Sequence, residues 1–186
     1  MRRAIAVLMA GLFILLGACG EEASVSPAIE FRAALVQAGG CTFRADVEAD
    51  FGGNVEHFTL DCEADADGTT RFSVVAPETL AGISATVTES GGKITYDGMA
   101  MDFGLLANGN VIPAAAPALA VCCWSGEYIA SGGEEDALYR ATYEKDFDEK
   151  MLTVDTWYEN SIPICAEVCY NNQRILKLSI SEFTMK

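Results

Sequence analysis

Seven cysteines are the residues of this 186-residue chain whose chemistry is easiest to anticipate. Cys19 stands apart, near the N-terminus and directly after an apolar run. The other six form an even set: Cys41, Cys62, Cys122, Cys123, Cys165 and Cys169. An even number of cysteines is typical of disulfides in an exported protein, whereas the same thiols stay reduced in a reducing compartment. Their pairing depends on the elements that carry them.

Cys41 and Cys62 lie on two segments in which apolar and polar residues alternate, as they do in half-buried strands. A turn at Gly52-Gly53 joins the two segments. The apolar pattern then predicts three cross-strand pairs: Phe43 with Leu60, Ala45 with Phe58, and Cys41 with Cys62. A cross-strand disulfide between Cys41 and Cys62 is therefore one interpretation, and two small buried thiols are the other.

The pairing of the remaining four cysteines is less determined by the sequence. Cys122 and Cys123 are neighbours, and Cys165 and Cys169 are too far apart along one extended strand to bond to each other. A bridge from the Cys122-Cys123 pair to either Cys165 or Cys169 is the plausible option, with Cys123 and Cys165 as the candidate residues. A four-cysteine zinc site is a weaker reading, because only the spacing of Cys165 and Cys169 matches such sites. We therefore expect no metal.

Two further groups of residues admit a catalytic or metal-binding reading. Glu63, Asp65, Asp67 and Gly68 resemble the start of a calcium loop, but the twelfth position is Val74 rather than a bidentate glutamate. Alternating acids on the outer face of a strand explain them equally well. His57 is the only histidine, and no nucleophile motif or phosphate-binding loop accompanies it. We therefore predict no enzyme and no cofactor.

The N-terminal residues have the order of a secretory signal: Arg2 and Arg3, an apolar segment over residues 5–16, then small residues. The closing stretch Leu16-Gly17-Ala18-Cys19 resembles the lipobox of bacterial lipoproteins. The resemblance implies cleavage after residue 18 and a diacylglyceryl thioether, with palmitate-type acyl chains, on Cys19. We thus expect residues 1–18 to be a signal peptide and residues 19–26 a lipid-anchored tether on the extracytoplasmic face of the cell membrane.

The composition restricts the partners of the chain. Its formal net charge is −15, with 27 acidic and 12 basic residues. A surface this acidic repels nucleic acid and anionic headgroups, so we predict no nucleic-acid partner. The lipid on Cys19 is then the expected contact with the membrane.

The rest of the chain, residues 27–186, reads as one domain. Helical patterns cover two segments, Pro27–Ala38 and Pro113–Trp124. Gly39-Gly40 ends the first of these helices. Period-two alternation predicts strands on both sides of Gly52-Gly53 and again near Phe72–Ala76. Further strands are expected at Ile83–Glu89, Lys93–Tyr96, Met99–Phe103, Leu138–Phe147, Met151–Tyr158, Ile164–Tyr170 and Arg174–Phe183.

Consecutive hairpins with two helices predict an α+β fold. Two helices are few for nine or so strands, so the long antiparallel sheet must curl on itself into a half-barrel, closed by the N-terminal helix and the internal helix. Large apolar residues face its interior, either as core or as the lining of a cavity. The candidates for such a lining are Phe72, Val74, Val87, Tyr96, Trp124, Trp157, Leu178 and Ile180.

Four segments carry a family resemblance: Arg71–Ile83 with its Pro-Glu-x-Leu-Ala-Gly-Ile turn, Lys93–Gly98, Ile162–Val168 and Arg174–Phe183. Their order resembles that of lipoproteins from Gram-positive, Clostridia-like bacteria, including germination lipoproteins, which share the fold of the lipoprotein carriers of the Lol pathway. The resemblance implies a half-barrel with a hydrophobic cavity. An anchored chain differs from true carriers, which shuttle freely.

Two functions follow as hypotheses. In the first, the anchored half-barrel binds a lipid or a lipidated partner in a cavity. In the second, the protein has no ligand cavity and docks another protein of the cell envelope through an apolar patch or a bare sheet edge.

Overall fold

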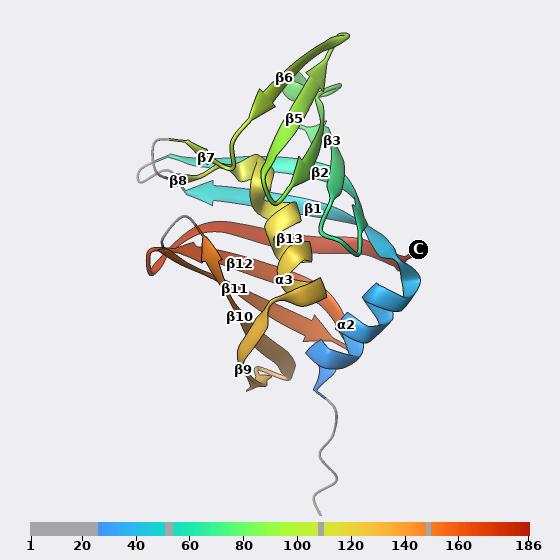
Figure 1. Ribbon diagram of the computed structural model, residues 1–186, viewed down its shortest axis with the longest axis vertical. Coiled ribbons are helices and arrows are strands. Elements are labelled where there is room, and N and C mark those ends of the chain that lie inside the picture. The colour runs from blue at the N-terminus through green and yellow to red at the C-terminus, as the bar shows by residue number, and fades with distance from the viewer. Residues whose placement is uncertain (1–25, 51–53, 108–109, 148–149) are drawn as a thin grey trace, which may run out of the picture.

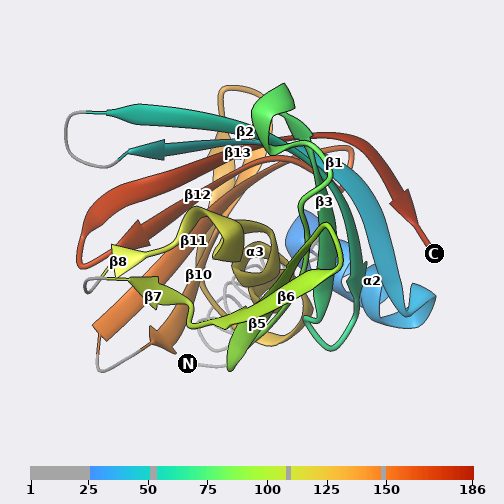
Figure 2. The same cartoon turned by 90° about the horizontal axis from the view of Figure 1, so that it is seen from above.

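A long antiparallel sheet curls around a single helix to form the domain (Figures 1 and 2). The computed structural model describes residues 26–50, 54–107, 110–147 and 150–186. The predicted signal peptide, Cys19, nearly all of the tether and the Gly52-Gly53 turn lie outside these ranges. Among the described residues, no helix combines the length and the hydropathy needed to span a bilayer.

The N-terminal helix α2 spans Pro27–Ala38, as the sequence predicts. Ser26 caps its start and Pro27 occupies the first turn, where its missing N–H costs no hydrogen bond. Gly39 ends the helix in the left-handed conformation (φ 77°) and donates its N–H to Val36 O. Helix α2 thus turns directly into the first strand.

Eleven strands make the main sheet, in the order β6-β5-β4-β3-β2-β1-β13-β12-β11-β10-β9. The first half of the chain supplies β1 (Gly40–Asp50), β2 (Val55–Asp65), β3 (Thr70–Ala76), β4 (Ser84–Thr88), β5 (Gly91–Tyr96) and β6 (Met99–Phe103). The second half supplies β9 (Tyr128–Glu135), β10 (Leu138–Phe147), β11 (Lys150–Glu159), β12 (Ile162–Tyr170) and β13 (Gln173–Met185). Because β1 pairs with β13, the two halves meet at the middle of the sheet.

The internal helix α3 (Ala116–Gly126) lies inside the curve of the sheet (Figure 2). A short 3-10 turn, η2 (Pro113–Ala115), precedes it, and the small ribbon of β7 (Leu106–Ala107) and β8 (Asn110–Val111) lies before that. Nearly every residue of α3 is buried and none of them is charged. A helix that is apolar all round belongs in a core, and the half-barrel supplies that core. The predicted α+β half-barrel with two helices is therefore confirmed.

The register of the first hairpin differs from the prediction. Cys41 faces Ala64, and Cys62 faces Phe43. The observed pairs, from Gly40 with Asp65 to Asp50 with Val55, are centred between residues 52 and 53, whereas the predicted pairs are centred one position earlier, so each partner is displaced by two residues. A displacement of two keeps every side chain on its predicted face, so the inward face was right although the Cys41–Cys62 pair was not.

Candidate functional site

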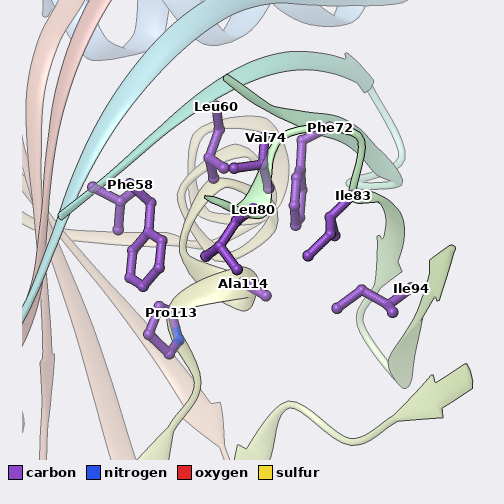
Figure 3. A pocket seen from close by; sticks show the side chains of 10 residues that line it. Phe58, Leu60, Phe72, Val74, Leu80, Ile83, Ile94, Pro113 and Ala114 are labelled. Atoms are coloured by element: carbon purple, nitrogen blue, oxygen red, sulfur yellow. The ribbon is translucent and has the colours of Figure 1, made fainter. Parts of the chain in front are cut away.

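An apolar cavity opens on the inner face of strands β1 to β5, beside the start of α3 (Figure 3). Its volume is about 210 Å³. Ten residues line it, all of them apolar: Val47, Phe58, Leu60, Phe72, Val74, Leu80, Ile83, Ile94, Pro113 and Ala114. Such a lining offers no side chain to a polar group, so the cavity suits hydrocarbon.

Local geometry explains how separate segments reach the cavity. Period-two alternation turns Phe72 and Val74 of β3 to the same face, next to the inward residues of β2. The corner between β3 and β4 contains the 3-10 turn η1 (Glu78–Leu80), which aims Leu80 inward beside Ile83. Pro113 and Ala114 of η2 form the opposite wall (Figure 3). The Pro-Glu-x-Leu-Ala-Gly-Ile turn singled out in the sequence thus contributes Leu80 and Ile83 to the cavity.

The other half of the concave face is filled. Trp124 of α3 is fully buried and lies between the rings of Phe31 and Phe43, with ring centroids 5.7 and 5.9 Å away. Its indole Nε1 donates to Thr156 Oγ1 at 2.9 Å. Cavity and core therefore coexist in one half-barrel, the cavity beside β1–β5 and the packed core beside β10–β13.

The eight residues predicted to line a cavity are divided between the cavity, the core and the surface. Phe72 and Val74 line the cavity. Val87, Trp124, Leu178 and Ile180 are buried in the core, and Tyr96 is half exposed on the inner face of β5. Trp157 lies on the outer face, because its neighbours Thr156 and Tyr158 face inward. The guanidinium of Arg140 lies over its ring, 5.1 Å from the ring centroid. The other lining residues share the inward alternation of Phe72, which is the signal that could have found them.

All six cysteines within the described residues are free thiols. Cys123 is buried in α3, on the inner side of the sheet, whereas Cys165 pairs with Trp157 on the outer face. The sheet lies between these two candidate thiols, so a bridge between them does not fit the fold. Burial raises the pKa of Cys41 to about 12 and also raises the pKa of Cys62 and Cys123. These thiols are therefore protonated and poorly nucleophilic at neutral pH.

Lys145 of β10 points into the half-barrel, with only 7% of its side chain exposed. It donates to Glu89, from the turn after β4, and to Glu127, at the end of α3. Desolvation lowers the pKa of Lys145, but the hydrogen bonds to the two carboxylates outweigh it and raise the pKa overall. Glu89, Glu127 and Cys122 could together ligate a metal, since their ligand atoms lie within 4.8 Å of one another. The ammonium of Lys145 already supplies the positive charge there.

The calcium-like acids are neutralised by cations of the protein itself. Asp65 accepts from Arg71 at 2.8 Å and from Lys186 at 2.6 Å, and Glu63 lies 2.9 Å from Lys186. These contacts hold the pKa of Asp65 below its ordinary value, chiefly through the hydrogen bond from Lys186. The acids therefore tie β2 to β3 and to the C-terminus.

His57 lies on the outer face, opposite Glu48 in the β1–β2 hairpin. A shallow groove there also contains Asp46 and Ser179. Asp46 accepts a hydrogen bond from Thr59 Oγ1 at 2.7 Å. Within the described residues no hydrogen bond joins His57 to an acid or a nucleophile, so the groove lacks the ordered contacts of a catalytic triad.

Comparisons with known proteins find matches among solved structures. No family model and no curated protein matches the chain. Among solved structures, it is similar to a LolA superfamily protein from Nitrosomonas europaea (8% identity, TM-score 0.44, 88% of this chain and 94% of that one). It is also similar to a putative outer membrane lipoprotein-sorting protein domain from Vibrio parahaemolyticus (8%, 0.49, 86% and 91%) and to the lipoprotein LppX from Mycobacterium tuberculosis (7%, 0.37, 86% and 96%). At such distances, the function has to be argued from the cavity itself.

Proposed function

We propose that this protein is a membrane-anchored, extracytoplasmic lipoprotein that binds the hydrocarbon part of a lipid or of a lipidated partner in its half-barrel cavity. The observation that carries the proposal is the cavity of about 210 Å³ with ten apolar lining residues. An empty apolar cavity of this kind binds apolar ligands in preference to water. Anchoring through Cys19, and the likeness to Clostridia-like lipoproteins, are predictions from the sequence.

The size of the cavity limits the ligand. Pockets that enclose a drug-sized molecule measure about 300–1,000 Å³, so the present cavity holds only part of a long ligand. Phe58, Leu80 and Ile83 are partly exposed at its rim, which leaves the cavity open to solvent. An acyl chain fits these conditions, because its end can enter the cavity while a headgroup or a polypeptide stays outside.

A matched pair of variants tests the proposal. Val74 faces the cavity, whereas its neighbour Val75 is exposed on the outer face of β3. In the mature chain carrying Cys19→Ser, we expect Val74→Trp to fill the cavity and to weaken binding of dansyl-undecanoic acid by about tenfold, a change of ~1.4 kcal/mol. Val75→Trp should change the affinity by less than about twofold.

Native mass spectrometry of the same proteins provides a second readout. The unsubstituted mature chain should retain a lipid that collisional activation releases, and Val74→Trp should lose it. Thermal unfolding of both variants controls for misfolding. Equal dye binding by two folded variants would contradict ligand binding in this cavity.

A further inference from the structure

Strand β6 forms one end of the eleven-stranded sheet and has only β5 as a neighbour in the sheet (Figures 1 and 2). Free edges are usually blunted by charges, proline or β-bulges, because an unpaired strand invites another chain to pair with it. The opposite edge, β9, has a register shift between Ile129 and Ser131 and ends in Glu134-Glu135, so it is protected in this way. The β6 sequence, Met-Ala-Met-Asp-Phe, has a single charge and neither glycine nor proline.

The turn between β5 and β6 determines which backbone groups are free. Asp97 and Gly98 both have positive φ (48° and 74°), as in a two-residue type I′ turn, and they join the pair Tyr96 and Met99. In an antiparallel hairpin, bonded and non-bonded pairs alternate, starting from a bonded closing pair. Ala100 and Asp102 therefore direct both their N–H and their C=O to the free edge.

The side chains of this hairpin continue the lining of the cavity. Ile94 lines the cavity, and Met101 lies opposite it across the hairpin. Tyr96 and Met99 form the next pair on the same face. Tyr96, Met99 and Met101 are 49%, 67% and 64% exposed. An apolar strip thus runs from the cavity along the inner face to the tip of the hairpin.

The charge of the chain limits which partners can bind at this edge. A second copy would bring another net charge of −15, and an anionic membrane would be repelled in the same way. Asp97 and Asp102 add negative charge at the hairpin, and Lys93, opposite Asp102, offsets one of these charges. We propose that β6 accepts an extended segment of a partner polypeptide as an added strand, with apolar side chains at alternate positions over Met99 and Met101 and with basic or neutral flanks. This docking site is independent of the ligand proposed for the cavity.

Binding of a synthetic peptide to the mature chain carrying Cys19→Ser tests the proposed docking site. The probe is a nine-residue peptide that alternates valine with threonine and has lysine at both ends. Addition as a strand should slow the exchange of the Ala100 and Asp102 amide protons about tenfold, measured by nuclear magnetic resonance at saturating peptide. The same peptide with two central residues replaced by proline should leave exchange unchanged.

Two variants at one position complete the test. Ala100→Pro removes an N–H that faces the free edge and keeps the hydrogen bonds to β5, so peptide affinity should fall about tenfold. Ala100→Thr retains the N–H and should bind within about twofold of the parent. Both variants should bind dansyl-undecanoic acid normally, which separates this site from the cavity. The proposal would be overturned if the peptide fails to bind at millimolar concentration or protects other strands instead of β6. It would also be overturned if β6 is protected only through self-association of the protein or only on lipid vesicles.

Discussion

Trp124 and Trp157 show how one residue type serves two environments. Trp124 is fully buried and donates to Thr156, whereas Trp157 lies on the outer face beneath Arg140. Trp124→Phe should lower the free energy of unfolding by about 1–3 kcal/mol, because it leaves the buried Thr156 hydroxyl without its donor. Trp157→Phe should cost less than about 1 kcal/mol, since it retains an aromatic face for Arg140. Urea denaturation measures both losses of stability. Equal losses would contradict the placement of Trp124 in the core and of Trp157 on the outer face.

The buried thiols produce a pH dependence of stability. Burial raises the pKa of Cys41 to about 12, while its unfolded value is near 8.5–9. A raised pKa means that the unfolded chain loses the thiol proton first, so stability is complete below about pH 8.5 and falls as the pH rises toward 12. Between pH 8 and pH 10, the Cys41 contribution should fall by about 1–2 kcal/mol.

Urea denaturation in reducing buffer at the two pH values measures this loss. Cys41→Ala removes the titrating group and should give a correspondingly smaller loss. A Cys41→Ala protein with the same pH dependence as the parent would show that Cys41 is not protonated and buried as described.

At the scale of elements, the junction between α2 and β1 depends on two adjacent glycines. A Cβ on Gly39 would meet no atom within 4 Å, whereas a Cβ on Gly40 would lie 2.1 Å from the carbonyl oxygen of Ala64. Gly39→Ala should therefore cost only about 1 kcal/mol, for a left-handed conformation. Gly40→Ala must displace the β1–β2 pairing and should cost several times more. Thermal denaturation of the pair checks this order, and a reversed order would refute it.

Lys145 connects strand β10 to the turn after β4, from the opposite half of the sheet, and to the end of α3. Lys145→Met should leave Glu127 and Glu89 close together without a cation, and we expect a loss of ~1–3 kcal/mol at pH 7. Because unpaired carboxylates are neutralised by acid, the loss should shrink toward pH 4. Adding Glu127→Gln to Lys145→Met should restore part of the stability, and failure to do so would contradict the proposed charge balance.

The sequence predicted most of these elements because their signals are local. Ser26, Pro27 and Gly39 define α2. The alternation of Tyr139, Ala141 and Tyr143 with polar residues predicts Leu138–Phe147 as a strand. Strand β9 was missed because Gly132-Gly133 has the composition of a loop. A Cβ on Gly132 would lie 2.2 Å from the hydroxyl oxygen at the end of the Tyr139 side chain, which would have to move aside. Contacts of this kind are set by tertiary structure and leave no local signal.

The cavity shows a second limit of the sequence. Phe72, Val74, Leu178 and Ile180 have the same inward alternation, yet only the first two line the cavity. The difference comes from where α3 lies inside the curved sheet, and no single strand encodes that position. Core and cavity demand the same apolar residues, so their separation appears only in the folded molecule.

The whole molecule combines an acidic domain with an expected lipid anchor. With a net charge of −15, the chain has no electrostatic attraction to an anionic bilayer, so we expect membrane binding to come from the predicted lipid on Cys19. Each buried methylene contributes about 0.8 kcal/mol, and two acyl chains hold a protein stably. Cys19→Ser should therefore move the protein from the membrane fraction to the soluble extracytoplasmic fraction.

The same substitution separates anchor from domain. Because the described strands and helices of the half-barrel and the residues that line the cavity all follow Ser26, the released protein should bind dansyl-undecanoic acid as the parent does. Cell fractionation followed by dye titration measures both effects. Retention of Cys19→Ser in a salt-resistant membrane fraction would mean that an apolar surface, of which the exposed Tyr96, Met99 and Met101 are the first candidates, holds the protein instead.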